Sequence, residues 1–426
     1  MKRIGLLVVF ILALPLVFQV TPLEILKLRV FDALVEKHEP SGNFVILNIT
    51  EEDVAREGGW PIPRQRLAQI HVDLLNKGAI GVGWVVSFPQ PDRFGGDEVF
   101  AEALSYGPTV LASFEYDNQI YPKTVGTILL GENISGIMAK GAVSNHKVFS
   151  TSPQGISAAP VEVDNLLRRM PLLYQTPDGF AASYGTEVLK VLANAKSYII
   201  RGDENGMQQI TVQGLPPVDV DSLGRKWISW IDTPQTDLET MDVAGKFVFV
   251  GVTAAGIMPQ IATPIGLLEP HKVQAALSES ILIPNSPKIP DWSIAAEIGI
   301  FIVSVALIWL LTQSFGMSLG LVLGGGALIM TGLGGAWMIR SGILIDVSWS
   351  VISQFIAGSV AFYLRFREQF KLRLQIKKQF EHYLDPKQVK RLQDNPDLLR
   401  LGGEKRVCTF LFTDLRGFTS LSENLE

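Results

Sequence analysis

The sequence predicts an α/β domain joined to α-helical segments that cross a membrane. Between 44 and 86 the chain alternates strand-like and helix-like stretches, which is typical of a sheet with parallel strands. After residue 290 it contains three apolar runs long enough to span a bilayer. The composition agrees, because 47% of the residues are hydrophobic and only 19% are charged, whereas soluble domains average about a quarter.

Length, charge and cysteine content narrow the class of protein further. A chain of 426 residues suggests two or three structural units. The net charge is −5, and no long basic stretch is interleaved with aromatic residues, so nucleic acid is not expected as a partner. Cys408 is the single cysteine, and the chain therefore contains no internal disulfide.

The first apolar run, 4–20, follows two basic residues at the N-terminus. It lacks a clear small-x-small cleavage site before Thr21, so we favour an uncleaved signal anchor, a transmembrane helix within 1–23. A cleaved signal peptide is the alternative. Pro15 should kink this helix, which a membrane helix tolerates.

Three further apolar runs cover 293–312, 316–338 and 343–364. Each has about 20 residues, the length that crosses the hydrocarbon core of a bilayer, and we expect three transmembrane helices in 291–364. A buried soluble hairpin is the alternative, but turns of only a few residues between three consecutive runs argue against it. Glu297 should lie at the membrane interface or inside the bundle, where a proton or signalling role is a second interpretation.

The second of these runs is rich in glycine. Small residues four apart on a membrane helix let neighbouring helices approach closely. We therefore expect tight helix packing along the glycines of this run, which are Gly316, Gly320, Gly324, Gly325, Gly326, Gly332, Gly334 and Gly335.

Basic residues predict the orientation of the chain. The stretch after residue 364 carries one acid, Glu368, and six basic side chains, and basic loops stay in the cytoplasm. Counting back through three spans places 24–290 outside, and one more span returns the basic N-terminus to the cytoplasm. The prediction is a four-span, multi-pass protein with both termini cytoplasmic, based on Lys2, Arg3, Arg365, Arg367, Lys371, Arg373, Lys377 and Lys378.

The outer domain, 24–290, begins with a β-α-β pattern. The stretches 44–49 and 79–86 read as strands, and 64–77 places its apolar residues on one helical face. A further core strand is expected at 246–252. Prolines at 284, 287 and 290 mark the linker into the membrane.

Several motifs in this domain carry a family resemblance. They are Gly59-Trp-Pro-Ile-Pro-Arg64, Phe88-Pro-Gln-Pro-Asp92, Gly245-Lys-Phe-Val-Phe-Val-Gly-Val-Thr-Ala-Ala-Gly256, Thr263-Pro264 and Glu269-Pro-His-Lys-Val-Gln-Ala275. Over about 250 residues the chain resembles a CHASE sensor domain of the second type, which implies an α/β extracytoplasmic sensor. One departure is Val85, which stands where members of the family often carry an aspartate.

Trp60, Arg64 and Asp92 lie in these motifs and are the candidate binding residues of the sensor. Their Trp-Pro and Pro-Asp contexts form turns, so we expect them to shape the edge of the sheet. Ligand binding is the alternative interpretation. The residues identify no ligand, and the extracytoplasmic stimulus stays unknown.

The connector 365–404 should begin as a helix that continues from the membrane. Phe366, Phe370 and Leu374 are four apart and lie on one helical face, although the pattern is not a clean heptad. A dimeric signalling helix and a juxtamembrane helix on lipid are both compatible with it. The strings that follow, Phe380-Glu-His-Tyr-Leu-Asp-Pro386 and Leu401-Gly-Gly-Glu-Lys-Arg406, resemble the transducer element that precedes class III cyclase domains.

The last segment, 405–426, resembles the opening of a class III adenylate/guanylate cyclase domain. Val407–Thr413 reads as a β-strand, and Asp414 follows it in the string Thr413-Asp-Leu-Arg-Gly-Phe-Thr419. The resemblance implies the start of an α+β ferredoxin-like catalytic domain. Taken without its flanks, Asp414 would read as a cap of the following helix.

The resemblance also implies a chemistry. Forming a cyclic nucleotide needs an activated 3′-hydroxyl and a neutralised pyrophosphate, which two Mg²⁺ or Mn²⁺ ions can supply. By analogy, Asp414 and the backbone of Leu415 would hold metal. The ATP phosphates would bind at Arg416, Gly417, Phe418 and Thr419. There Gly417 would let the backbone approach the phosphates closely, and the N-terminus of the following helix would offer its amides.

The expected function is that of a receptor-type adenylate cyclase in a bacterial inner membrane, with ATP as substrate, lipid around its helices and a homodimeric catalytic site. The other catalytic residues would lie beyond Glu426, so we expect 1–426 to make no cyclic AMP. Guanylate cyclase activity and a non-catalytic membrane sensor are the alternatives. A receptor kinase is disfavoured because no kinase Gly-rich loop is present.

Overall fold

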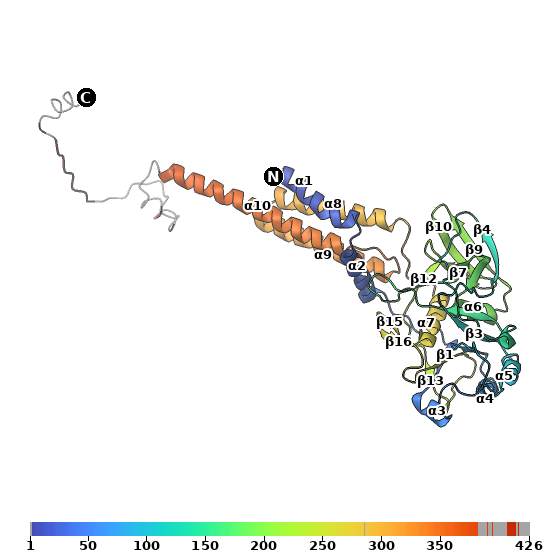
Figure 1. The fold of residues 1–426 in the computed structure, drawn as a ribbon. Coiled ribbons are helices and arrows are strands. Elements are labelled where there is room, and N and C mark those ends of the chain that lie inside the picture. Colours follow the sequence, from blue (N-terminus) through green and yellow to red (C-terminus); the bar gives the residue numbers. More distant parts are fainter. Residues whose placement is uncertain are drawn as a thin grey trace. The chain divides into compact units, whose positions relative to one another are not determined.

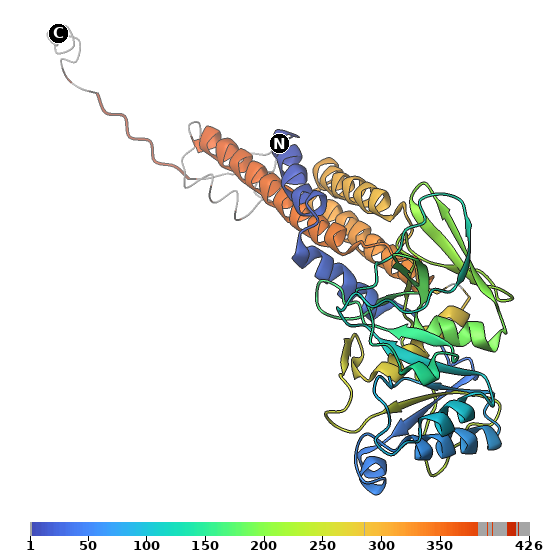
Figure 2. The same ribbon diagram turned by 45° about the vertical axis from the view of Figure 1, so that its right-hand side comes forward.

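The computed structural model describes residues 2–284, 286–381, 390, 394, 407–414 and 416. It divides into two units, residues 1–362 and 363–426, which are treated separately below. The first unit contains the α/β domain and the helices next to it. Figures 1 and 2 show its elements from two directions.

A six-stranded parallel sheet organises the α/β domain. The order of its strands is β13-β1-β14-β2-β3-β5, so β14, which comes late in the chain, lies between β1 and β2. The strands predicted at 44–49, 79–86 and 246–252 are confirmed as β1, β2 and β14. The bounds are β1 Phe44–Ile49, β2 Gly81–Trp84, β3 Thr109–Phe114, β5 Gln154–Ser157, β13 Gln235–Thr236 and β14 Phe247–Val252.

Helices cover both faces of this sheet (Figure 1). In β14, Phe247 and Phe249 face the cluster that contains α6 and α7, while Val248 and Val250 face the cluster that contains α4 and α5. All four side chains are fully buried, as expected for a parallel sheet enclosed on both sides. The helices are α3 Glu51–Arg56, α4 Arg64–Asn76, α5 Asp97–Leu104, α6 Tyr184–Leu192 and α7 Pro270–Leu282, and α4 confirms the predicted helix.

A second, four-stranded sheet of order β11-β10-β9-β4 packs beside the first. Its strands are β4 Gly126–Leu130, β9 Ser197–Asp203, β10 Gly206–Val212 and β11 Val218–Asp219. Three two-stranded pairs and a 3₁₀ turn complete the domain: β6 Arg169–Pro171 with β12 Arg225–Trp227, β7 Leu173–Thr176 with β8 Gly179–Ala182, β15 Ile261–Thr263 with β16 Gly266–Leu268, and η1 Lys147–Phe149.

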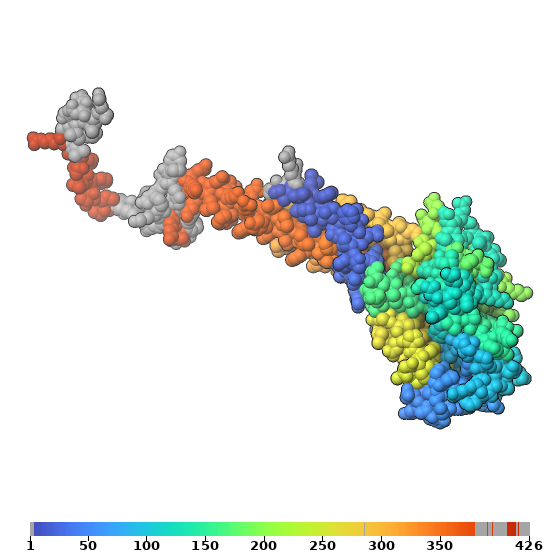
Figure 3. Space-filling model, in the orientation of Figure 1, coloured from blue at the N-terminus to red at the C-terminus, as the bar shows by residue number. Residues whose placement is uncertain are grey.

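The N-terminal anchor differs from the single helix predicted within 1–23. Helix α1 spans Lys2–Val17, and a second helix, α2, spans Thr21–Leu34 at 77° to it. The break lies at 18–20, where Gln19 has a positive φ of 44° and Val20 is extended, and Pro22 lies in the first turn of α2, where its missing N–H costs no helical hydrogen bond. Figure 3 shows these blue segments against the orange helices of the bundle, where the Trp349 Nε1 donates to the Leu12 carbonyl at 2.8 Å.

The apolar runs after residue 290 form α8 (Ser293–Ser314), α9 (Met317–Arg340) and α10 (Ser348–Glu381). Among the described residues, α8 and α9 are long and apolar enough to cross a membrane, and α1 with α2 adds a third span if the bent pair counts as one. The four predicted spans are therefore not all supported. The run at 343–364 becomes helical only at Ser348, because Ile343 pairs with Lys288 instead.

In the second unit, α10 continues to Glu381, which confirms the predicted helix after the membrane. The strand predicted at Val407–Thr413 is wrong for this structure, in which 407–414 have no regular secondary structure. Val407, Phe410 and Phe412 are largely exposed. A strand needs a neighbour to satisfy its backbone, and the described residues provide none here.

Candidate functional site

The candidate sensor site is the crevice at the carboxyl ends of β1 and β14. These strands are neighbours, yet the chain leaves them toward opposite faces of the sheet. After β1 it enters α4 on one face, and after β14 it enters α7 on the other. Such a point in a parallel sheet opens a crevice in which ligands commonly bind.

A cavity of about 340 Å³ occupies this crevice, lined by Val252, Thr253, Ala254, Ala255, Gly256, Met258, Gln260 and Glu269. The Glu51 carboxylate accepts a hydrogen bond from the Ala255 amide at 3.0 Å, which ties the two loops together. The small side chains of the β14 loop leave the backbone accessible. The cavity can therefore hold a small polar molecule, and its size is at the lower end of known ligand sites.

Glu269 is the charged group of this crevice. Burial raises its pKa, but hydrogen bonds from Lys272, its own backbone and Gln260 outweigh that effect and hold the pKa below its ordinary value. The Lys272 Nζ lies 3.0 Å from its Oε2 atom. The carboxylate thus stays ionised at neutral pH.

Helix α7 joins the crevice to α8, a helix long and apolar enough to cross a membrane. Glu269 immediately precedes α7, and the linker after Leu282 leads to α8 at Ser293. His271, in the first turn of α7, packs against Gly251 of β14 so closely that an added Cβ would overlap its ring.

The sequence-predicted cluster of Arg64 and Asp92 has a structural role. Asp92 accepts hydrogen bonds from the Arg64 and Gly96 amides, each at 3.1 Å, and so caps the start of α4. The Arg64 guanidinium is buried, with its Nε 3.6 Å from Asp97 and its carbon 4.4 Å from the centre of the Phe88 ring. These contacts fit the expected shaping of the sheet edge.

The third candidate, Trp60, is partly buried and packs against the cluster of α4 and α5, and it does not line the crevice. Val85, which departs from the family pattern, is fully buried in the cluster of α6 and α7.

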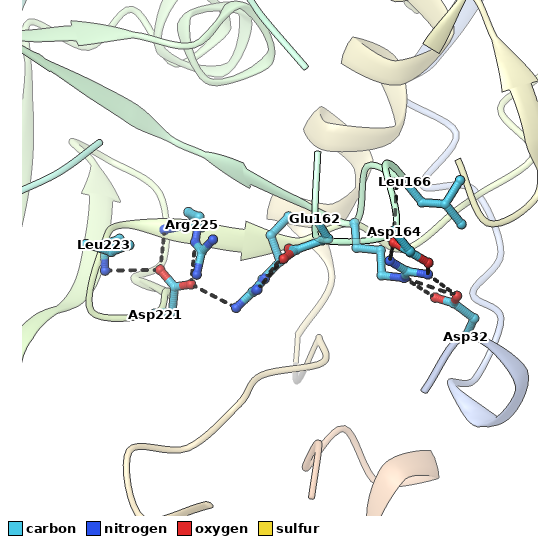
Figure 4. Close-up of polar contacts among 9 residues, drawn as sticks. Asp32, Glu162, Asp164, Leu166, Asp221, Leu223 and Arg225 are labelled. Carbon is cyan, nitrogen blue, oxygen red and sulfur yellow. Dashed lines mark hydrogen bonds and ion pairs between the residues drawn. The ribbon is translucent and has the colours of Figure 1, made fainter. Parts of the chain in front are cut away.

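A second feature is the joint between α2 and the α/β domain (Figure 4). The Arg168 guanidinium, whose side chain is 0% exposed, donates to Asp32 of α2 and to Asp164. Its Nε lies 2.8 Å from the Asp32 Oδ1, and its Nη1 lies 2.7 Å from the Asp164 Oδ1. Paired hydrogen bonds of this geometry fix orientation as well as distance.

Further charges extend the joint along the domain (Figure 4). Arg169 donates to both oxygens of Glu162 at 2.7 Å, and Asp221 bonds to Arg225 at 2.7 Å. The hydrogen bond from Arg168 holds the pKa of Asp164 below its ordinary value. Burial raises the pKa of Glu162, but the hydrogen bond from Arg169 and the charges of Arg169, Arg225 and Arg168 together hold it below its ordinary value.

Apolar and polar contacts then tie α2 to the helices of the bundle. Phe31 of α2 stacks edge-on with Trp227, and the same cluster contains Ile339 of α9. Lys27 of α2 lies 2.9 Å from Glu297 of α8, and Glu297 also accepts the Asp346 amide at 2.9 Å. The prediction that Glu297 lies inside the bundle or at its interface fits this position.

The residues predicted for metal and nucleotide binding lie in the second unit. Asp414 and Arg416 are described and exposed, whereas Leu415, Gly417, Phe418 and Thr419 lie outside the described residues. In the part of the chain that the structure describes, no group of three or more His, Cys, Asp or Glu could hold a metal ion. Asp414 is a single exposed carboxylate, and the described residues bring no second one to it.

Sequence reasoning missed the joint. Asp164 and Arg168 are four residues apart and oppositely charged, but such pairs are common on protein surfaces. Asp32 is 136 residues away from Arg168 in the chain and lies between 24 and 43, where no element was predicted. Buried arginine is rare unless paired, but burial is invisible without the fold.

Comparison with protein families agrees with this architecture. The family model described as the CHASE2 domain matches residues 5–312, which include α1, α2 and α8 as well as the α/β domain. No curated protein and no solved structure gave a match. The chain belongs to the CHASE2 family, whose domain is an extracytoplasmic sensor.

Proposed function

We propose that this CHASE2 protein is a transmembrane receptor whose sensor domain controls a class III adenylate cyclase activity, the conversion of ATP to cyclic AMP and pyrophosphate. The observation that carries the proposal is the order in which the sensor domain, the apolar helices and the cyclase-like string follow one another along the chain. The crevice adjoins α7, α7 leads to α8, and α10 runs from the bundle to Glu381. The string around Asp414 follows in the sequence.

In this receptor a small polar molecule in the crevice is the stimulus, and the joint at Arg168 transmits its effect to α2. The sensor domain lies outside the cytoplasm of a bacterium and the cyclase segment inside, in agreement with the basic residues after the bundle. The chain passes the inner membrane several times among its lipids, and with α10 counted as a fourth span both of its termini lie in the cytoplasm.

The activity itself rests on resemblance. By that resemblance Asp414 would be one carboxylate ligand of a bound Mg²⁺ or Mn²⁺, which would supply positive charge for the triphosphate and the 3′-hydroxyl. Class III sites form between two catalytic domains, so the receptor acts as a homodimer.

The test uses the natural reading frame that encodes this chain, expressed in a bacterial host without adenylate cyclase. Membranes are assayed with Mn²⁺ and either ATP or GTP. We expect cyclic AMP from the wild type, its loss in Asp414→Ala, and normal turnover in Asp394→Ala, which removes an exposed carboxylate outside the motif. Formation of cyclic GMP instead would favour a guanylate cyclase. If neither cyclic nucleotide forms, the non-catalytic sensor is the interpretation that stands.

A further inference from the structure

Helices α8, α9 and α10 surround a cavity of about 350 Å³ in the apolar bundle. Its lining includes Ile308 of α8, Gly324 and Gly325 of α9, and Gly358 of α10. At its rim Leu321 and Phe355 are 60% and 67% exposed, so a molecule dissolved in the bilayer can reach it. The volume is in the range of small-molecule sites.

One polar side chain in the lining is unusual. Gln354 of α10 is 0% exposed and lines the cavity. Its Oε1 lies 3.4 Å from the Thr331 hydroxyl, and its Nε2 has no hydrogen-bond partner among the described residues. Turning the carboxamide over would exchange the two atoms and leave the oxygen unpaired instead.

The neighbouring hydroxyls do not satisfy this amide. Thr312 donates to the Ile308 carbonyl at 2.9 Å, and Ser359 donates to the Phe355 carbonyl at 2.7 Å, so both bond within their own helices. The Thr331 hydroxyl also donates to the Ala327 carbonyl at 3.0 Å. In hydrocarbon an unpaired amide is costly, because no water is present to bond it.

We propose that this cavity binds a lipid-soluble molecule that carries a carbonyl or hydroxyl group, with Gln354 as its polar contact. The glycines of α9 leave room for a flat body, and Phe355 and Phe362 provide aromatic faces. A quinone dissolved in the membrane and the ester of an acyl lipid share this chemistry. The inference is independent of the proposed cyclase activity.

The experiment measures binding to the purified full chain in lipid nanodiscs by the shift of its thermal unfolding temperature. Three probes separate the contributions: decylubiquinone carries carbonyls on a ring, decylbenzene lacks any polar atom, and methyl palmitate carries an ester on an acyl chain. We expect saturable binding of a carbonyl probe, several-fold tighter than that of decylbenzene. Preference for decylubiquinone identifies a quinone-like ligand, and preference for methyl palmitate identifies an acyl lipid.

Variants assign the binding to this cavity. Gln354→Leu should abolish the preference over decylbenzene and raise the unfolding temperature of the free protein, which also shows that it folds. Gly325→Leu should fill the cavity and weaken all probes, since no atom lies within 4 Å of the added Cβ. Gly334→Leu, equally free of neighbours but outside the lining, should bind normally. Equal binding by wild type and Gln354→Leu, or no saturable binding to the wild type, overturns the proposal.

Discussion

The central sheet is held together by apolar contacts, whereas the joint at α2 is held together by buried ion pairs. In the sheet, Phe247 and Phe249 are fully buried among other apolar side chains, with ring centres 5.3 Å apart. In the joint, Arg168 is equally buried but lies between the carboxylates of Asp32 and Asp164. Apolar contacts are non-directional, whereas the paired hydrogen bonds of a guanidinium form only in one relative orientation of the two groups.

This difference separates stability from the docking of α2. Burial of apolar surface drives folding of the α/β domain. A buried ion pair adds little net stability, because the cost of removing the charges from water offsets most of their attraction. Removing one partner is nevertheless destabilising, because the other charge is then buried without a partner. We infer that the sheet maintains the sensor and that the joint holds α2 in one position. Three variants test this division, in order of expected effect.

The largest effect should come from the sheet. Phe249→Ala removes a fully buried ring that contacts Phe44, Tyr184 and Phe247, and should lower the free energy of unfolding by about 4 kcal/mol. Urea unfolding of the purified chain, followed by circular dichroism, measures it. Leu267→Ala, at a side chain that is 61% exposed, is the control and should cost well under about 1 kcal/mol. Equal losses of unfolding free energy in the two variants would contradict the conclusion that the buried rings of the sheet stabilise the domain.

The joint should come next. Arg168→Ala takes the buried guanidinium from Asp32 and leaves Asp164 with the more exposed Arg29 alone, and should cost about 3 kcal/mol. It should also expose α2 to limited proteolysis between 18 and 43 while the α/β domain stays intact, a readout that Phe249→Ala should not share under native conditions.

Two controls sharpen the comparison at the joint. Arg225→Ala removes a more exposed partner of Asp221 and should cost less than about 1 kcal/mol. Replacing Arg168, Asp32 and Asp164 together by Met, Leu and Leu should recover stability, because no charge is stranded. A triple variant as unstable as Arg168→Ala would mean that the ion pairs themselves stabilise the fold.

The smallest effect concerns a polar group inside the sheet's own core. Burial lowers the pKa of His71 to about 4, and the Trp84 indole donates to its Nδ1 at 3.2 Å. Because the folded pKa lies below the ordinary 6.5, the unfolded state binds more protons between these values. Stability should be complete above about pH 6.5 and fall by about 2 kcal/mol at pH 5.

Thermal unfolding of wild type and His71→Gln across this pH range measures the effect. The glutamine can accept the same bond from Trp84 but does not titrate, so its stability should vary less from pH 7 to pH 5. Identical pH dependence in the two proteins would show that other groups cause the loss.

Much of the fold was predictable because local patterns report local structure. Continuous apolar runs predicted the strands at 44–49 and 246–252, and the periodicity of 64–77 predicted α4. The prediction of secondary structure failed where contacts between residues far apart in the chain determine the structure. The apolar run 343–364 starts its helix at Ser348 because Ile343 pairs with Lys288, and the run 407–413 has no strand to pair with among the described residues.

The candidate sites depended even more on the tertiary structure. Val252 and Glu269 belong to motifs noted in the sequence, but nothing in the motifs showed that the two residues line one crevice. Arg168 and Gln354 carried no signal at all, because their importance lies in burial, which depends on what packs around them. The opposite holds for the Asp414 motif. Its sequence resembles that of a metal- and nucleotide-binding site, but the described residues form no metal site around it.

The sequence on its own determined the class of the protein, because apolar periodicity, basic clusters and turn motifs are properties of short stretches. It was sufficient to predict an α/β sensor attached to membrane helices. Only the tertiary structure decided that β14 inserts between β1 and β2, that α2 bends away from α1 and that Arg168 meets Asp32. These are contacts between residues far apart in the chain, and such contacts follow from the global packing of the apolar core and the pairing of buried charges within it.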